Sequence, residues 1–192
     1  MDNSPLEMAC AAIAHGHVVG VPTDTVYGLA IDPRRKDSFE ALYAVKRRAP
    51  DKAIPILVSD ADQAAGIVEV SELGRHLMST HWPGGLTIVL KRRRDVPVHL
   101  GDPVAGTVAV RAPNNQVALD LLRMCGPLAV SSANRSDDEP AIDAQSAREV
   151  FGVEVAVYLE GSEPIGTPST VVDATGSEPL VLRTGAVDLG SS

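Results

Sequence analysis

The chain has 192 residues, of which 44% are hydrophobic and 22% charged, and its 17 Lys+Arg against 25 Asp+Glu give a formal net charge of −8. This composition excludes a disordered chain, and the length favours one domain with a substantial core. The negative charge argues against strong nonspecific binding to nucleic acid, and no apolar run approaches the roughly 20 residues of a membrane helix. Because the start, MDNSPLEMAC, lacks the basic region of a signal peptide, we expect a cytoplasmic protein.

Helical and strand patterns alternate in the first third of the chain. Residues 4–7 (SPLE) form a capping-box pattern, which predicts a helix that ends near Gly16. The apolar residues 18–21 predict a strand that Pro22 ends. Asp37, followed three residues later by Glu40, predicts the cap of a second helix that ends in a basic cluster.

The rest of the chain mixes both kinds of element without an internal repeat. Further helices are expected near residues 61–68, 71–80, 117–125 and 143–151, and further strands at residues 54–58, 86–92, 107–111, 127–133, 155–159, 169–174 and 179–183. The pattern predicts an α/β fold: a single domain over residues 1–192, with a twisted, open, mixed sheet flanked by helices. The last strands follow one another without helices and should pair antiparallel.

Two cysteines, Cys10 and Cys125, lie in apolar segments. Each is therefore expected to be a small buried hydrophobic residue, with no disulfide framework or zinc site. The five histidines show no metal-binding spacing, so no metal site is expected.

Four segments contain more polar and charged side chains than a turn or a strand end needs for folding. They are PTDTVYGLA at residues 22–30, the cations of residues 46–52, GPLAVSSANRSDDEPA at residues 126–141 and GTPSTVVDATG at residues 166–176. The first is either a turn that satisfies its own backbone or a site for a small polar ligand. The basic cluster is either a solvated helix end or an anion-binding site. Pro50 favours an end of the helix inside this cluster.

Arginine, lysine, serine, threonine and asparagine recur in these segments, and Arg111 and Arg183 each end a predicted strand. Such side chains bind phosphates and carboxylates, and they promote phosphoryl or nucleotidyl transfer by positioning and charge neutralisation. The chain lacks the P-loop and the GxGxxG fingerprint, so a nucleotide would be held in another way. It also lacks the GxSxG elbow of serine hydrolases.

Seven motifs together resemble the threonylcarbamoyl-AMP synthase (TsaC/YrdC) family. In chain order they are PTDTVYGL, the Lys-x-Arg pair in KRR, WPGGLTIVL, GTVAVRAP, SSAN, PSTVVD and VLRTG, within a core of about residues 6–186. The resemblance implies condensation of L-threonine, bicarbonate and ATP to threonylcarbamoyl-adenylate and pyrophosphate. It also implies the short, single-domain form with a twisted open sheet.

The resemblance also assigns roles to particular residues. It implies a catalytic set of Lys46, Arg48, Ser132 and Asn134. ATP would contact Arg48, Lys52, Thr107, Ser132, Asn134 and Arg183. Threonine would contact Thr25, Lys46, Arg111 and Ser169, with Lys46 between the two substrates. The chain differs from the usual family pattern at Ala49, Asp137 and Thr184, which border the nucleotide side.

The family further implies cofactors and partners. Mg²⁺ would arrive with the ATP phosphates, because the sequence offers no dedicated carboxylate cage. A threonylcarbamoyl transferase complex would then modify tRNA. This chain itself would bind tRNA weakly, and no interaction with a membrane is expected. Two alternatives stay open: an RNA-binding module, and an enzyme that uses another carbamoyl or adenylate substrate.

Overall fold

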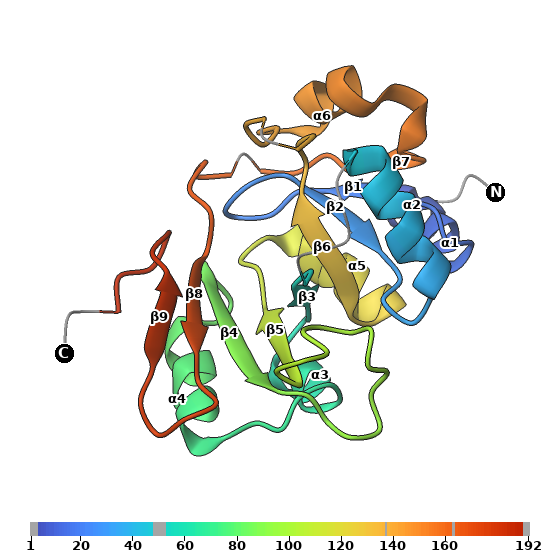
Figure 1. Ribbon diagram of the computed structural model, residues 1–192. Coiled ribbons are helices and arrows are strands. Elements are labelled where there is room, and N and C mark those ends of the chain that lie inside the picture. The colour runs from blue at the N-terminus through green and yellow to red at the C-terminus, as the bar shows by residue number, and fades with distance from the viewer. Residues whose placement is uncertain (1–3, 48–52, 137, 163, 190–192) are drawn as a thin grey trace.

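The structure, a computed structural model, describes residues 4–47, 53–136, 138–162 and 164–189. Its strands form one sheet in the order β7-β1-β2-β6-β3-β5-β4-β8-β9 (Figure 1). The strands are β1 (Val19–Val21), β2 (Gly28–Ile31), β3 (Ile56–Leu57), β4 (Leu86–Lys91), β5 (Thr107–Arg111), β6 (Leu128–Ser132), β7 (Val157–Tyr158), β8 (Thr170–Asp173) and β9 (Leu180–Arg183). The helices are α1 (Pro5–Ala14), α2 (Lys36–Lys46), α3 (Ala61–Ala65), α4 (Glu72–His81), α5 (Gln116–Cys125), α6 (Ala144–Phe151) and the 3₁₀ turn η1 (Gly152–Glu154).

The sheet is mixed, which confirms the predicted fold class. Parallel pairs join β1 with β7, β3 with β5 and β4 with β8, and the other neighbouring strands run antiparallel. The expected antiparallel pairing of the last strands holds for β8 with β9 and is wrong for β7. The chain after β7 crosses the sheet, where the amides of Ile165 and Gly166 donate to the carbonyls of Asp24 and Thr25. It therefore reaches the opposite edge before β8 begins.

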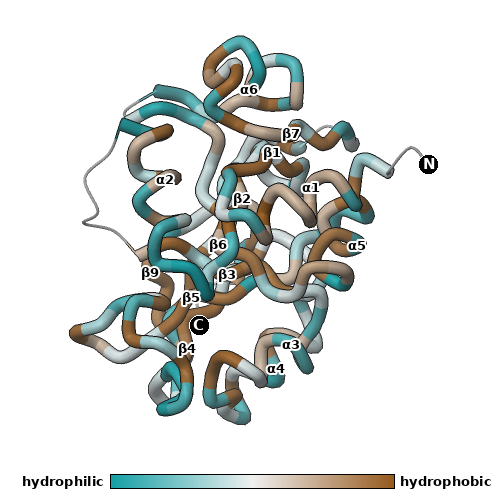
Figure 2. Tube along the Cα trace, turned by 90° about the vertical axis from the view of Figure 1, so that its right-hand side faces the viewer, coloured by the Kyte–Doolittle hydropathy of each residue, from teal (hydrophilic) through white to brown (hydrophobic). Residues whose placement is uncertain are grey.

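Apolar side chains form two clusters on opposite faces of β2 and β6. One cluster joins α1 and α5 to residues such as Val21, Leu57 and Val130, and the other joins α2 and α4 to residues such as Leu29 and Ile56. Figure 2 shows α2 on one side of these strands and α1 and α5 on the other, with hydrophobic residues concentrated along the strands. Burying apolar surface on both faces is the main stabilising contribution to this layered arrangement.

The helix ends follow local chemistry that is partly readable from the sequence. At α1 the Ser4 hydroxyl accepts from the amide of Glu7 and the Glu7 carboxylate accepts from the amide of Ser4, as the capping-box pattern predicted. The expected cap of α2 at Asp37 is wrong, because α2 begins at Lys36 and Asp37 pairs with Arg35 in the first turn. The helix ends at Lys46 because Arg47 adopts the left-handed conformation (φ 50°).

The expectation for the cysteines is also wrong. Cys10 in α1 and Cys125 in α5 form a disulfide between segments 115 residues apart, and both side chains are half-buried. The two helices pack side by side, which brings the cysteines together although nothing in their spacing indicates a pair. None of the described helices is long and apolar enough to cross a membrane.

Candidate active site

A cavity of about 470 Å³ opens on the face of the sheet beside α1 and α5. Its lining comes from nearly every strand and from the loops that follow them: Thr23, Thr25, Val26, Gly28, Ala53, Ile54, Pro55, Leu57, Thr87, Ala109, Arg111, Val130, Ser131, Ser132, Pro140, Pro168, Ser169, Val171 and Arg183. Apolar residues form much of the wall, and arginines and hydroxyls supply the polar groups. Cavities of this size and mixed lining commonly hold small molecules.

Strand register explains why these residues share one face. Directly paired residues project to the same side of a sheet, and Leu57 is paired with Arg111. Thr87 is likewise paired with Val171, which is paired in turn with Arg183. The period of two along each strand places Ala109 on the same face of β5 as Arg111, and both residues line the cavity. Residues far apart in the sequence thereby meet over a few neighbouring strands.

The guanidinium of Arg111 is a buried cation of this site. It donates from Nε to the carbonyl of Gly84 (2.9 Å), from Nη1 to the Thr25 hydroxyl (2.7 Å) and from Nη2 to Asp24 Oδ1 (2.5 Å). Burial lowers the pKa of Arg111, and the charge of Asp24 opposes that effect. Three of its five N–H donors have these partners, and the other two have none among the described residues, so they could meet an anionic group. A carboxylate matches that geometry.

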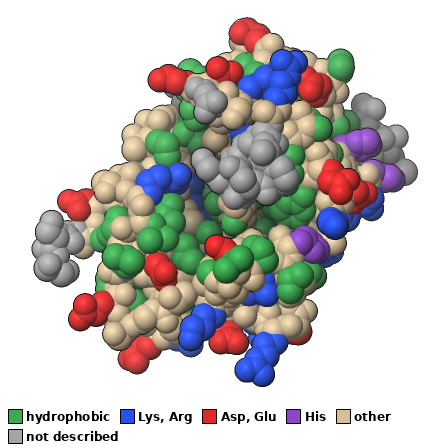
Figure 3. Space-filling model, in the orientation of Figure 1, with side chains coloured by type: hydrophobic (Ala, Val, Ile, Leu, Met, Phe, Trp, Pro, Cys, Tyr) green, Lys and Arg blue, Asp and Glu red, His purple; other side chains and the backbone are tan. Residues whose placement is uncertain are grey.

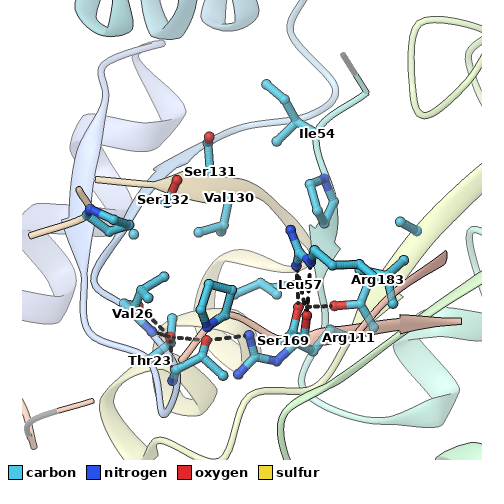
Figure 4. A pocket seen from close by; sticks show the side chains of 18 of the residues that line it. Thr23, Val26, Ile54, Leu57, Arg111, Val130, Ser131, Ser132, Ser169 and Arg183 are labelled. Atoms are coloured by element: carbon cyan, nitrogen blue, oxygen red, sulfur yellow. Dashed lines mark hydrogen bonds between the residues drawn. The ribbon is translucent and has the colours of Figure 1, made fainter. Parts of the chain in front are cut away.

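A group of hydroxyls and a second arginine lies beside Arg111. The hydroxyls of Thr87 and Ser169 are hydrogen-bonded at 2.8 Å, and both residues are buried. Arg183 donates from Nη2 to the Ser169 hydroxyl (3.1 Å) and to its carbonyl (2.9 Å). Figure 4 shows Arg111 and Arg183 approaching Ser169 from two sides, with Ser131 and Ser132 at the other end of the cavity. Burial lowers the pKa of Arg183. Thr25, Arg111, Ser169 and Arg183 thus line the same cavity, and their assignment to particular substrates stays a prediction.

Lys46 belongs to a second polar cluster, at the end of β6. Its ammonium donates to the carbonyls of Ser132 (2.5 Å) and Asn134 (2.8 Å) and to Asn134 Oδ1 (3.2 Å). The Ser132 hydroxyl donates to the same Oδ1 at 2.6 Å. Lys46, Ser132 and Asn134 are therefore one hydrogen-bonded unit. Ser132 also lines the cavity, so this residue links the unit to the Arg111 end of the site.

The structure does not place three other predicted residues in the cavity: one lies outside its lining and two are not described. Thr107 begins β5, four residues before Arg111, where its amide donates to the carbonyl of Asp102, and it does not line the cavity. Its predicted contact with ATP stays a prediction. Arg48 and Lys52 lie outside the described residues, as do Ala49 and Asp137 among the departures from the family pattern.

Asp24, Thr87 and Ser131 take part in the site although the sequence analysis assigned none of them a role; Asp24 and Ser131 stand in two of the four polar segments, and Thr87 does not. Asp24 stands in the quoted PTDT motif, but its pairing with a residue 87 positions away is visible only in the fold. Thr87 faces the cavity because of its register with Val171. The PTDT turn and the alternation of β4 are the sequence features that could have indicated the first two.

The donors of the site suit anions rather than a resident metal. The described ranges contain no group of three or more His, Cys, Asp or Glu side chains that could hold a metal ion. Asp24 is committed to Arg111 and to the amide of Asn114. A cation that accompanies a phosphate ligand would therefore take its remaining ligands from phosphate and water.

The fold and the site together are those of a mixed α/β protein whose open cavity, lined with arginines and hydroxyls, has the chemistry to accept a small anionic molecule. The Sua5/YciO/YrdC family model, described as "Telomere recombination", matches residues 11–185. The chain belongs to this family.

The names of similar proteins agree with the family resemblance that the sequence motifs indicated. A Mycobacterium tuberculosis protein, provisionally named threonylcarbamoyl-AMP synthase, is 41% identical over 181 residues, which cover 93% of this chain and 83% of that protein. The threonylcarbamoyl-AMP synthase of Pyrococcus abyssi is 32% identical over 187 residues, covering 96% of this chain and 55% of that protein. This chain therefore spans about half the length of the P. abyssi protein.

Solved structures agree with the fold. The P. abyssi Sua5 structure complexed with L-threonine superposes with a TM-score of 0.87 at 31% identity, covering 96% of this chain and 56% of that one. Escherichia coli YciO gives a TM-score of 0.87 at 25% identity, covering 96% of this chain and 90% of that one.

Proposed function

We propose that this protein is a threonylcarbamoyl-AMP synthase, which converts L-threonine, bicarbonate and ATP to threonylcarbamoyl-adenylate and pyrophosphate. The observation that carries the proposal is the buried Arg111 guanidinium, with two available N–H donors, beside the Thr87 and Ser169 hydroxyls. A carboxylate and a hydroxyl of one small amino acid would fit these groups. The names of the relatives and the threonine complex of P. abyssi Sua5 support the same substrate.

The polar groups divide between the substrates. Threonine would lie against Thr25, Arg111 and Ser169. ATP would extend toward Ser132, Asn134 and Arg183, and the predicted roles of Arg48, Lys52 and Thr107 are retained in this proposal. Lys46 would stand between the substrates, where its charge favours the anionic bicarbonate and carbamate.

The chemistry needs positioning more than acid–base catalysis. The threonine amine attacks the carbon of bicarbonate, which gives the carbamate and releases water. A carbamate oxygen then attacks the α-phosphate of ATP, and the bond from that phosphorus to the β-bridging oxygen breaks to release pyrophosphate. Arg111 holds the threonine carboxylate away from the phosphates, while Lys46 and Arg183 neutralise charge near the reacting groups.

The remaining assignments follow the same proposal. The class of enzyme is nucleotidyltransferase. Mg²⁺ would be carried by the ATP phosphates and would neutralise charge on the departing pyrophosphate. The product would pass to a threonylcarbamoyl transferase complex that modifies tRNA, with weak tRNA binding by this chain itself, and the reaction would take place in the cytoplasm.

Pyrophosphate release from purified protein tests the function. We expect release only when threonine, bicarbonate and ATP are all present, and threonylcarbamoyl-adenylate as the accompanying product. K46A should abolish release, because it removes the ammonium that joins Ser132 and Asn134. K36A removes an exposed lysine from the first turn of the same helix and should retain activity. Wild-type protein that releases no pyrophosphate under these conditions refutes the proposal.

A further inference from the structure

Arg135 is the most extensively bonded side chain next to the Lys46 unit. Its Nη1 donates to the carbonyl of Val45 at 2.7 Å. Its Nη2 donates to the carbonyl of Val150 at 3.1 Å and to Glu154 Oε1 at 2.6 Å. The guanidinium carbon also lies 5.2 Å from the centre of the Phe151 ring. Only 16% of the Arg135 side chain is exposed, so these contacts are largely shielded from water.

These contacts join three separate parts of the chain. Arg135 stands in the loop after β6, Val45 in the last turn of α2, and Val150 in the last turn of α6. In Figure 1, α6 lies above the end of β6 and close to α2. One planar guanidinium thus connects the ends of α2 and α6 with the loop that follows β6.

The position of Arg135 in the sequence relates these contacts to the site. Arg135 directly follows Asn134, and its partner Val45 directly precedes Lys46. A main-chain hydrogen bond from the amide of Ser136 to the carbonyl of Lys46 (3.1 Å) runs beside the Arg135 contact. The loop that carries Ser132 and Asn134 is therefore held against the helix end that carries Lys46.

Arginine suits this role for two physical reasons. The last carbonyls of a helix lack partners within the helix, and they carry the negative end of its dipole. A guanidinium can satisfy carbonyls of two helices at once because its donors point in fixed, divergent directions. Glu154 compensates the charge, and Phe151 packs against the face of the guanidinium.

We propose that Arg135 is a positioning residue for the reaction. It fixes the distance between the Lys46 ammonium and the Ser132–Asn134 loop, although it does not touch a substrate. This inference rests on the proposed function. Loss of the guanidinium removes one of the contacts between the loop and the end of α2 and leaves those of Ser136 and the Lys46 ammonium, so the Lys46 charge is held less firmly where bicarbonate and the α-phosphate meet.

Kinetics of Arg135 variants test the inference. In R135A we expect kcat for pyrophosphate release to fall by about 10–100-fold, because small displacements of a positioned group carry losses of this size. The KM for threonine should change little, since Arg111, Thr25 and Ser169 lie on other elements. R135K, which retains the positive charge but not the forked donors, should have a kcat between those of wild type and R135A. E154Q leaves both carbonyl contacts of Arg135 in place, so its kcat should fall less than that of R135A.

The matched control is R148A, on the same helix. Arg148 is an exposed arginine whose guanidinium lies 5.0 Å from the Tyr158 ring centre and 3.8 Å from Glu160, and neither partner belongs to α2 or to the loop after β6. R148A should keep wild-type kcat. Equal kcat values for R135A and R148A overturn the positioning role, as does a loss in R135A that appears only in KM.

Amide hydrogen exchange gives a readout that does not depend on activity. Exchange at the Ser136 amide should be faster in R135A than in wild type, because its bond to Lys46 then opens more often. We call the Arg135 contacts that hold the loop after β6 against the end of α2 the clamp. An exchange rate at Ser136 that is the same in R135A and wild type refutes the clamp. If wild-type protein lacks the proposed activity but R135A speeds this exchange, the proposed function fails and the clamp stands. Should R135A not fold, R135K, which loses the forked donors but keeps the charge, is used for both measurements, with the same direction of change expected.

Discussion

Arg111 and Asp24 show how single residues connect the energetics of the fold with the site. The Arg111 side chain is 7% exposed and that of Asp24 is 18% exposed, so the pair lies largely out of water. A buried charge is costly unless it is paired and hydrogen-bonded. Asp24 therefore makes it possible to keep a guanidinium at the base of the cavity, where its free donors can meet a ligand.

Removing Asp24 should destabilise the protein strongly. In D24A the Arg111 guanidinium would remain buried without its countercharge, and we expect the free energy of unfolding in urea to fall by about 3–5 kcal/mol. D24N keeps an oxygen acceptor for Arg111, so its free energy of unfolding should fall less than that of D24A. D120A, which removes an exposed carboxylate paired with Arg123, should lose at most about 1 kcal/mol. Equal stabilities for D24A and D120A would contradict this account of Arg111.

The Arg135–Glu154 pair predicts a dependence of stability on pH. The hydrogen bond from Arg135 lowers the pKa of Glu154 below its usual value of 4.5. A carboxyl group whose pKa is lowered on folding stabilises the protein above the unfolded pKa, and that contribution is lost as pH falls through the folded value. Wild type should therefore exceed E154Q in Tm at pH 7, and the difference should shrink below pH 4.5.

The matched control for this pH series is E149Q. Glu149 lies on α6, and its exposed carboxylate accepts from the Gln145 side chain rather than from an arginine. We expect E149Q to follow wild type across the series. A constant gap between wild type and E154Q from pH 7 to pH 3 would be incompatible with an ion pair at Glu154.

At the scale of elements, the sequence predicted the start of the first helix better than it predicted which strands pair with each other. The capping box at Ser4 was readable because a cap depends on residues within one turn. The strand β2, Gly28–Ile31, was missed because its four residues are all buried and show no alternation. The partner of β7 could not be predicted either, since it depends on the path of the loop that crosses the sheet over Asp24 and Thr25.

The disulfide between α1 and α5 predicts a redox-dependent stability. A covalent link between residues 115 apart restricts the unfolded chain, and such links typically contribute about 2–5 kcal/mol to stability. Thermal unfolding should therefore shift to lower Tm when wild type is treated with a reductant under native conditions. The double variant C10S/C125S should unfold near the reduced protein and show no response to the reductant. A wild-type Tm that is the same with and without reductant would contradict the link.

At the scale of the whole molecule, the sheet assembles the site from segments that the sequence could identify only one at a time. The family resemblance assigned a catalytic set that includes Lys46, Ser132 and Asn134, and these three residues form one hydrogen-bonded unit. It assigned Thr25, Lys46, Arg111 and Ser169 to threonine; Thr25 is hydrogen-bonded to Arg111, whereas Ser169 is hydrogen-bonded to Thr87 and Arg183. Asp24 and Arg135 were not assigned because their partners lie 87 and 90 positions away. Register and loop paths, rather than local pattern, decide such contacts.

On the face drawn in Figure 3, the described charged side chains fit a small-molecule site better than a nucleic-acid interface. On that face the basic and acidic side chains are interspersed, and hydrophobic side chains gather over the flank formed by β9, where Leu180, Val181 and Leu182 are exposed. A nucleic-acid site would be expected to show a continuous basic stripe. The alternative of an RNA-binding module is not favoured.

Calorimetric titration of L-threonine into the purified protein is the most direct test of the central claim, that Arg111 and its neighbouring hydroxyls bind the amino acid substrate. We expect saturable binding of threonine, weaker binding of L-serine, and loss of threonine binding in R111K, because lysine lacks the planar fork that holds Thr25 and a carboxylate together. Thermal unfolding of R111K serves to establish that the variant is folded. Threonine binding of equal affinity in wild type and folded R111K, or no binding in wild type, would contradict the account.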